Sequence, residues 1–419
     1  MNDSSNMIRQ DKKLLNITVF DCFAILYFIH KLLPSVGYYM PSFIFLGIFV
    51  LLFLFSIHRI SKMKKTNELG KMALIFLIVL PDCIQYIVTG NFMGLPIYLY
   101  GQLQILLFGL VILGYDHVAQ EHKKKDLFYF IILCYALTAV TTIIGNIRYP
   151  MASRFLATGD PLAVSLYTSQ NIGGFTFAYE LVLIIPLLIY AFKNGVFSRW
   201  ISAGLIILFG YAIIKAEYTM ALLYFILSLI LFLIPRLTTR KIYVIIAIFV
   251  ILFIFSGDYI ADLLRQLSRN VRSEIFSTRF EEIAAFFEGN DNADMGNAAN
   301  RFERYKSSFD SFVNTGFMGI WGRAGYGRIG GHSFILDIMG QFGVLGIVAM
   351  ILMYGMIYTM FVKPYRSKGF YAYYFYVYLT AIVLAVLNTK VHLFVFIVIF
   401  PLFAKIMDEV EIKNLEDNK

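Results

Sequence analysis

Runs of about 20 apolar residues recur along this 419-residue chain and constrain its fold more than any other feature. A run of that length lets a helix cross roughly 30 Å of hydrocarbon while every backbone N–H and C=O bonds within the segment. Apolar residues make up 59% of the chain and charged residues only 15%, which excludes an ordinary soluble globular protein. The sequence therefore predicts an all-α polytopic membrane protein.

Twelve runs are predicted as transmembrane helices. They cover residues 14–33, 41–60, 72–90, 96–115, 127–145, 173–192, 200–215, 218–235, 242–257, 333–360, 370–388 and 391–407. No internal repeat or flexible linker divides the chain, so we expect a single membrane domain. Its parts are residues 1–257 with nine helices and an outer connector at 146–172, residues 258–332 as one large extracytoplasmic loop, residues 333–407 with three helices, and residues 408–419 as a cytoplasmic tail.

Lysine and arginine in the short connectors predict the orientation in the cell membrane. These residues gather after the even-numbered spans, at 59–71, 123–125, 193–199, 236–241 and 363–368. Because short cytoplasmic loops carry excess positive charge, both termini are expected in the cytoplasm, and the large loop is expected outside. The net charge of +9 is explained by these connectors and by lipid head groups, so no nucleic-acid partner is expected.

The side predicted as outer is rich in arginine, whereas the inner side favours lysine. It carries ten arginines (Arg148, Arg154, Arg265, Arg269, Arg272, Arg279, Arg301, Arg304, Arg323, Arg328) and four lysines (Lys31, Lys215, Lys306, Lys390). The planar guanidinium group suits bidentate binding of phosphate or carboxylate. Any single arginine is about as well explained by pairing with an acid of the loop, but the whole set indicates an anionic ligand.

A glycine-rich segment closes the large loop directly before the tenth predicted span. It reads Gly325-x-Gly327-x-x-Gly330-Gly331, and it suits a backbone that approaches a ligand closely and exposes amide donors. Because no strand precedes it and a membrane span follows, its GxGxxG pattern does not indicate a dinucleotide site.

His332, Ser333 and Asp337 follow at the mouth of that span. Histidine is suited to take a proton near neutral pH, and an acid within the bilayer is costly unless it has a partner or a function. The nearby glycines and arginines favour a catalytic His332 over an interfacial histidine that only satisfies its own hydrogen bonds. Asp337 lies five residues further on and is imperfectly placed to contact it.

Polar groups elsewhere are weaker candidates. Lys215, Glu217 and Tyr218 form a short turn between the seventh and eighth spans and can line the same outer cavity. Other polar groups within spans are expected to pair and hold the bundle together; they are Asp21, Asp82 with Gln85, Glu180 and Lys390. The acids at 289–297 do not fit a calcium-binding EF-hand loop, so no metal is expected. Aromatic residues at helical spacing predict helices at 275–287 and 302–312 on the membrane surface.

The order of these motifs resembles the bacterial O-antigen and capsular polysaccharide polymerases, which share an architecture with the O-antigen ligases. The resemblance covers roughly residues 146–346. It lies in the G-x-G at 325–327, the H-S-x-x-L-D at 332–337, the glycines at 343 and 346, Arg148 and Arg154 before 171–174, the 215–222 hairpin, and Arg279 and Arg301 ahead of G-x-G. The ligases' usual hairpin sequence, similar to Ser-Arg-Gly, is replaced here by residues 215–219, which favours a polymerase.

The resemblance implies a membrane-embedded glycosyltransferase without metal or cofactor. Its substrates would be undecaprenyl-diphosphate-linked oligosaccharides, polymerised into capsule, exopolysaccharide or O-antigen, and its partners the lipid bilayer, a flippase and a chain-length regulator. His332 would orient or deprotonate the acceptor hydroxyl. Substrate-binding roles would fall to Arg148, Arg154, Lys215, Tyr218, Arg279, Arg301, Arg304, Arg323, Gly325, Gly327, Ser333 and Asp337. A ligase, or a flippase or exporter of lipid-linked sugars, is the alternative; the missing internal repeat counts against a transporter.

Overall fold

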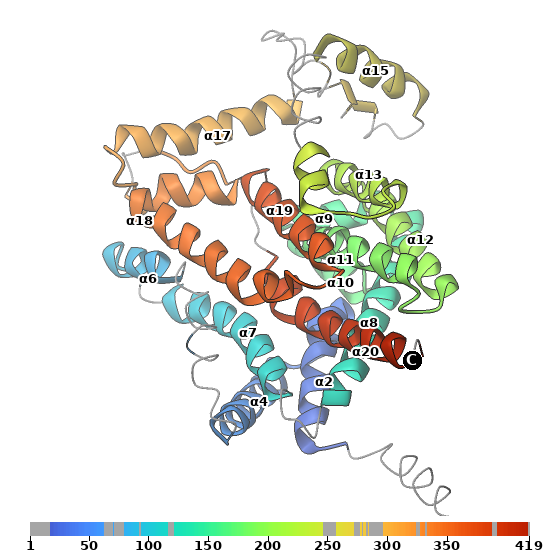
Figure 1. Ribbon diagram of the computed structural model, residues 1–419. Coiled ribbons are helices and arrows are strands. Elements are labelled where there is room, and N and C mark those ends of the chain that lie inside the picture. The colour runs from blue at the N-terminus through green and yellow to red at the C-terminus, as the bar shows by residue number, and fades with distance from the viewer. Residues whose placement is uncertain are drawn as a thin grey trace, which may run out of the picture.

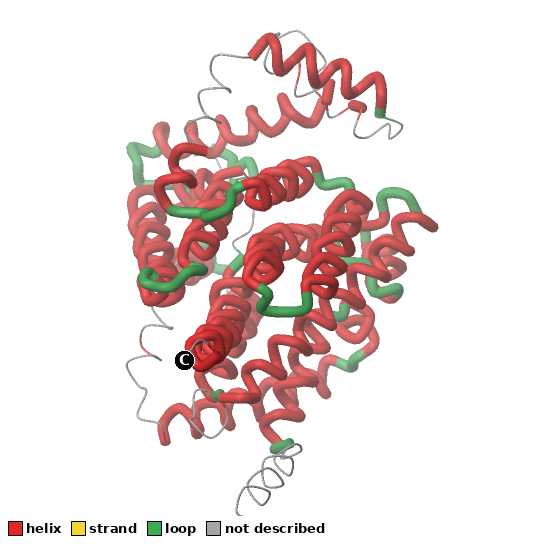
Figure 2. The backbone as a smooth tube through the Cα atoms, turned by 45° about the vertical axis from the view of Figure 1, so that its right-hand side comes forward, coloured by secondary structure: helices red, strands yellow, loops and turns green. Residues whose placement is uncertain are grey.

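The computed structural model describes most of the chain. The described residues are 17–62, 70, 79–91, 94–115, 121–245, 257–271, 277–278, 280–281, 284, 296–323, 327–331, 333–387 and 392–417. Figure 2 shows helices joined by loops over this part of the chain, and no strand occurs in it. The predicted all-helical class is therefore confirmed for the described residues.

The helices are labelled in Figure 1. The first group is α2 (Val19–Leu32), α3 (Pro34–Tyr39), α4 (Ser42–Lys62), α6 (Val79–Val88), α7 (Gly94–Gly114), α8 (Glu121–Arg148), α9 (Ala152–Thr158), α10 (Pro161–Ser169), α11 (Phe175–Asn194), α12 (Arg199–Ala216) and α13 (Thr219–Leu233). The second group is α15 (Gly257–Asn270), α17 (Gly296–Asn314), α18 (Phe334–Ile357), η3 (Tyr358–Val362), η4 (Lys363–Tyr365), α19 (Tyr371–Leu387), η5 (Val395–Ile399) and α20 (Phe400–Asp417).

Among the described residues, five helices are long and apolar enough to cross a membrane. They are Ser42–Lys62, Lys123–Arg148, Phe175–Asn194, Arg199–Ala216 and Phe334–Tyr365, and four shorter apolar helices accompany them at Val79–Val88, Tyr98–Gly114, Met220–Leu233 and Tyr371–Leu387. The chain therefore has the helices of a polytopic membrane protein. The count of twelve spans stays a prediction, because the predicted spans at 72–90 and 242–257 lie partly outside the described residues.

Helix α11 forms the centre of the bundle. Every residue from Leu181 to Ile189 is buried, and α11 packs against α12, α13 and α19. Its interior Pro186 is buried as well. The sequence is apolar on all sides of this helix, which is the pattern of a helix enclosed by others rather than one with a polar face.

The predicted connectors contain helices that apolar length alone does not reveal. The 146–172 connector holds α9 and α10, the 258–332 loop holds α15 and α17, and the predicted tail continues α20 to Asp417. The aromatic spacing at 302–312 correctly lies within α17. Figure 1 shows α15 and α17 at the top of the view, with α17 lying across the first part of α18. Short helices of this kind are too short or too polar to span a bilayer.

Helix α18 was predicted to be continuous, but its backbone is broken at Gly343, where φ is 62° and ψ is −144°. The break frees backbone groups that the segment 317–321 takes up. The Val344 N–H donates to the Phe317 carbonyl (3.0 Å), and the carbonyls of Gly340 and Gln341 accept N–H groups from residues 320 and 321 (3.0 and 2.9 Å). Irregular backbone in a membrane helix is tolerated only where such groups are satisfied.

We expect Gly343→Ala to destabilise the protein by roughly 1–3 kcal/mol or more, because these φ and ψ values are nearly glycine-only. An added Cβ would also lie 2.2 Å from the Phe317 carbonyl oxygen. The measurement is the thermal unfolding midpoint in detergent. Gly355→Ala is the matched control, since its Cβ meets nothing within 4 Å. Equal midpoints for the two variants would contradict the role of the break.

Helix α17 exposes charged residues in its first half and mainly apolar ones at its end and in the following turn, whereas its described buried residues are serines. Ser308 (0% exposed) and Ser311 pack toward α18, and Gly340 lies against the Ser308 backbone. The exposed apolar residues are Phe309, Val313, Phe317 and Met318 (71% exposed), while Glu303, Arg304, Lys306 and Asn314 are exposed as well. Small residues at a helix contact with apolar residues outside are typical of membrane helices, and here this pattern is confined to the end of α17 and the turn after it. Through Phe317, this apolar end continues into the exposed apolar side of α18 at Val344.

We expect the apolar C-terminal end of α17 to contact lipid hydrocarbon. In a variant without native cysteines, Val313→Cys in nanodiscs should react with a water-soluble maleimide about tenfold more slowly than Glu303→Cys, because a thiol in hydrocarbon does not ionise. Glu303 is exposed on the same helix and provides the matched position. Equal labelling rates would show that the C-terminal half of α17 lies in water.

Candidate functional site

The first turn of α18 carries the carboxylate around which the candidate site is built. The side chain of Ser333 caps the helix by accepting the Leu336 N–H (3.1 Å). Ser and Asp at these positions satisfy N–H groups that have no partner within the helix. This local structure follows from the sequence H-S-x-x-L-D itself.

The Asp337 carboxylate binds three separate parts of the chain. Its Oδ1 accepts the Ser308 hydroxyl (2.7 Å) and the Gly331 N–H (3.1 Å), and its Oδ2 accepts the Ser333 N–H (3.2 Å). Hydrogen bonds to an ionised group are stronger than neutral ones. Asp337 therefore fastens the glycine-rich segment and α17 to the start of α18, and we name this group of bonds the Asp337 latch.

Helix α17 holds the glycine-rich segment at further points. The hydroxyls of Ser307 and Ser311 donate to the Arg328 carbonyl (2.7 and 3.0 Å), and the Gly330 N–H donates to Ser308 Oγ (2.9 Å). A Cβ on Gly330 would lie 2.1 Å from the Arg304 carbonyl oxygen. These glycines were predicted to approach a ligand closely; among the described ones Gly327 and Gly330 lie against α17, whereas a Cβ on Gly331 would meet nothing within 4 Å.

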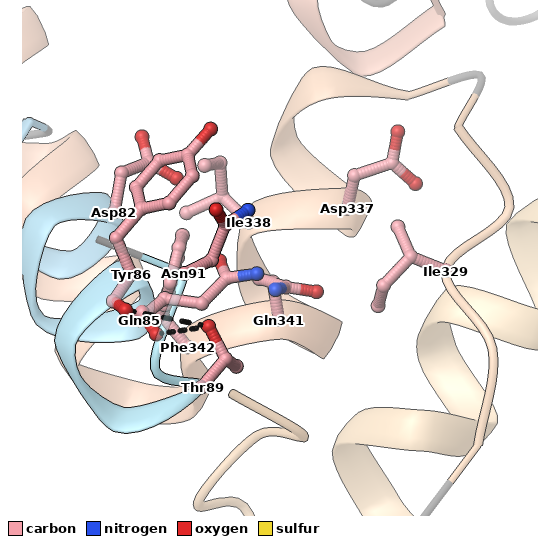
Figure 3. A pocket seen from close by; sticks show the side chains of 10 residues that line it. All are labelled: Asp82, Gln85, Tyr86, Thr89, Asn91, Ile329, Asp337, Ile338, Gln341 and Phe342. Carbon is pink, nitrogen blue, oxygen red and sulfur yellow. Dashed lines mark hydrogen bonds between the residues drawn. The ribbon is translucent and has the colours of Figure 1, made fainter. Parts of the chain in front are cut away.

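A cavity of about 440 Å³ lies between α6 and α18, beside the latch. Figure 3 shows side chains of the two helices converging on it, with Asp337 and Ile329 at one end. The lining residues are Asp82, Gln85, Tyr86, Thr89, Asn91, Ile329, Asp337, Ile338, Gln341 and Phe342. Ligand pockets commonly have volumes of roughly 300–1,000 Å³. This cavity is therefore large enough for a small organic ligand.

Of the α6 residues in this cavity, Asp82 and Gln85 were expected to pair and hold the bundle together, and Tyr86 was not singled out. Asp82 does accept a hydrogen bond from the Tyr98 hydroxyl, which agrees with that expectation. Gln85 and Gln341 are different, since both side-chain amides line the cavity. An amide within an apolar run is the sequence signal that points to such residues, because burying one without a partner is costly.

Three of the predicted site residues lie outside the described residues: His332, Arg279 and Gly325. His332 stands in the chain between Gly331 and Ser333, whose amides both donate to Asp337. Arg301 belongs to α17, but its side chain is not described. The latch therefore holds the residues on both sides of the predicted catalytic position.

The remaining predicted cations near the latch are exposed. Arg304 projects from α17, Arg323 follows the segment that crosses the break in α18, and Arg328 lies in the glycine-rich segment next to Gly327. Gly327 has φ of 133°, and a Cβ there would lie 2.3 Å from Ser311 Oγ. The exposed side chains of Arg323 and Arg328 are accessible to an anion in solution or at a membrane surface.

A second group of predicted residues lies on α9 and the α12–α13 turn. The Tyr218 hydroxyl donates to the Ser153 carbonyl, which fastens the turn to α9. Glu217 ends α12 in the left-handed conformation (φ 56°), and its buried Oε2 accepts no hydrogen bond from a described residue. Burial raises the pKa of Glu217, while the charges of Arg154 and Lys215 lower it. Arg148 is exposed at the end of α8 and has no described contact with this group.

A buried polar network fixes the connector that contains α9 and α10. Asn146 Nδ2 donates to Ser153 Oγ (2.7 Å), and Ser153 Oγ donates to the Gly173 carbonyl (2.8 Å). Asn171 Nδ2 donates to the Thr141 hydroxyl (3.0 Å), and its Oδ1 accepts the Ser35 N–H (3.2 Å). Satisfied polar groups in an apolar interior make such a connector rigid. The second group of cations is therefore held on a fixed support.

The fold and these contacts define a helical membrane protein with a polar site at the start of a broken helix. Comparison with models of known protein families and with curated protein sequences found no match. Among the described residues, no group of three or more His, Cys, Asp or Glu side chains is arranged to hold a metal ion.

We expect Asp337→Asn to loosen the glycine-rich segment. The Asn amide nitrogen cannot accept the N–H or O–H groups that the carboxylate binds, and hydrogen bonds to charged groups contribute roughly 1.5–3 kcal/mol. Amide hydrogen exchange at residues 327–331 should accelerate by at least about tenfold. Asp310→Asn on α17 is the control, because Asp310 is half-buried like Asp337 and forms none of these bonds. Unchanged exchange in Asp337→Asn would show that the latch does not order the segment.

Proposed function

We propose that this protein is a membrane-embedded glycosyltransferase that polymerises undecaprenyl-diphosphate-linked oligosaccharide repeats at the outer face of the cell membrane. The observation that supports this most is the Asp337 latch. It holds Gly331 and Ser333, the chain neighbours of His332, next to a polar cavity at the end of an apolar helix. A lipid-linked sugar needs this combination, since its polyprenyl chain stays in lipid while its sugars react in a polar site.

In the proposed reaction, a hydroxyl oxygen of one lipid-linked repeat attacks the anomeric carbon of another lipid-linked glycan. The new glycosidic bond forms as the bond between that carbon and the diphosphate oxygen breaks. Undecaprenyl diphosphate leaves with the bonding electrons, and His332 accepts the proton of the attacking hydroxyl. The diphosphate is already a good leaving group, so the proposal requires no metal.

Cations near the latch have a role in this reaction. Negative charge develops on the leaving diphosphate, and fixed positive groups aimed at that charge lower the barrier. Exposed Arg304, Arg323 and Arg328 lie around the glycine-rich segment, and Arg154 and Lys215 lie on the second rigid support. Arg279 and Arg301 are assigned the same role from the sequence. Guanidinium groups bind phosphate oxygens in pairs, which suits a diphosphate.

The experiment that tests this function is the chain-length ladder of surface and lipid-linked glycan in cells that express His332→Ala at the native level. We expect the ladder to be lost while single repeats still reach the outer face, because general-base catalysis contributes about 10²- to 10⁴-fold to the rate. His58→Ala is the control, since His58 is exposed on α4.

The other outcomes separate the alternative functions. An unchanged ladder would remove His332 from the mechanism. Repeats that remain on the cytoplasmic side would identify a flippase or exporter. Long lipid-linked polymer that is not passed on to another carrier would identify a ligase.

A further inference from the structure

The described residues that line the cavity between α6 and α18 give its wall acidic, amide and hydroxyl groups and no basic side chain. None of its ten lining residues is Lys, Arg or His, and two of them, Asp82 and Asp337, are carboxylates. A diphosphate in this space would be repelled by the carboxylates and would find no cation among the described lining residues. The wall therefore selects against the charged part of a lipid-linked glycan.

Several polar groups in the wall have hydrogen-bonding capacity that the protein does not use. In the described part of the chain, no hydrogen bond involves the side-chain amides of Gln85 and Gln341 or the Tyr86 hydroxyl. Each amide offers two donors and an acceptor, and the phenol offers one donor and an acceptor. These side chains are only half-buried and none of their polar atoms is a buried atom without a partner, so they are accessible to a ligand or to water.

Apolar surface completes the wall. Ile329, Ile338 and Phe342 lie beside the polar groups, and the Tyr86 ring packs near the Tyr98 ring, with centroids 5.6 Å apart. A sugar ring presents C–H groups on its faces and hydroxyls around its edge. Amides that donate and accept, placed next to apolar surface, match both parts of an uncharged sugar.

The wall is held in place by the break in α18. The Gln341 carbonyl accepts the Trp321 N–H (2.9 Å), two residues before Gly343, so the backbone that carries the Gln341 amide is fixed. On the opposite side, Gly322 lies against α6, and a Cβ added to Gly322 would be 2.9 Å from Gln85 Nε2. The same short segment therefore contacts both amide-bearing helices, which keeps the two amides in a defined arrangement.

We propose that the α6–α18 cavity is a carbohydrate subsite in which the amides of Gln85 and Gln341 bind hydroxyls of an uncharged sugar of the repeat unit. This inference rests on the proposed function. The diphosphate stays outside the cavity, at the exposed arginines. Asp337 lies at the boundary of the two regions, because it lines the cavity and also holds the residues next to His332.

The first test detects the occupant directly. The photoreactive amino acid p-benzoylphenylalanine replaces Tyr86 in the full-length protein, in cells that make surface polysaccharide, and the irradiated protein is analysed by mass spectrometry. We expect a glycan adduct that disappears when transfer of the first sugar to undecaprenyl phosphate is deleted. The same substitution at Tyr243, which is exposed on another helix, is the control and should carry no glycan. A lipid adduct alone, or no adduct, at position 86 would overturn the proposal.

The second test separates binding from chemistry. Lipid-linked repeats extracted from cells that lack this protein serve as substrate for the purified protein in nanodiscs. Gln85→Leu and Gln341→Leu should each raise KM about tenfold with little change in kcat, since one hydrogen bond of about 1.4 kcal/mol corresponds to that factor. Gln102→Leu on α7 is the matched control, because Gln102 is half-buried and does not line the cavity. Unchanged KM in both cavity variants would overturn the subsite.

The two proposals fail in different ways. A glycan adduct at position 86 together with an unchanged ladder in His332→Ala keeps the sugar site and removes the catalytic role of His332. A lost ladder in His332→Ala together with no glycan adduct and an unchanged KM keeps the polymerase and overturns the subsite.

Discussion

The exchange of backbone hydrogen bonds at Gly343 is the interaction on which the site depends. A continuous α18 would use the Gly340 and Gln341 carbonyls within its own helix; the break instead offers them to residues 320 and 321. In an apolar environment these groups must find partners, so the segment after α17 is bound to α18 through its main chain. That attachment sets α17 across α18 and brings the same segment against α6. The cavity, the latch and the exposed apolar end of α17 all follow from it.

Charge is divided between two regions around Asp337. The half-buried carboxylate accepts hydrogen bonds from Ser308, Gly331 and Ser333. The cavity on one side of it has acidic and amide groups, while the exposed arginines lie on the glycine-rich segment, on α17 and on the segment between them. A substrate with an uncharged glycan and an anionic leaving group has the same division of charge between its two parts. Electrostatics of this kind orients a ligand as well as binding it.

The second group of charges depends on polar networks rather than on apolar packing. Asn146 and Asn171 join α8 to the connector that carries α9, and Tyr218 joins the α12–α13 turn to the same helix. Glu217 lies among positive charges there, and its raised pKa reflects the burial of a carboxyl whose Oε2 accepts no described hydrogen bond. Fully satisfied buried networks rigidify a structure, whereas a partly satisfied acid is a place where a ligand or a proton changes the balance.

The sequence by itself determined the helical class and most helix positions, because apolar length and helical periodicity are local properties. It also indicated Ser333 as a polar residue at the start of α18 and placed a helix at 302–312. The break at Gly343 was not predictable, since Gly-x-x-Gly fits a straight helix as well as a broken one. Asp337 and its partner Ser308 are 29 residues apart in the chain. The cavity amides of Gln85 and Gln341 come from segments about 250 residues apart. Only tertiary structure brings such groups together, because backbone groups freed in one helix must be satisfied by whichever segment packs against it.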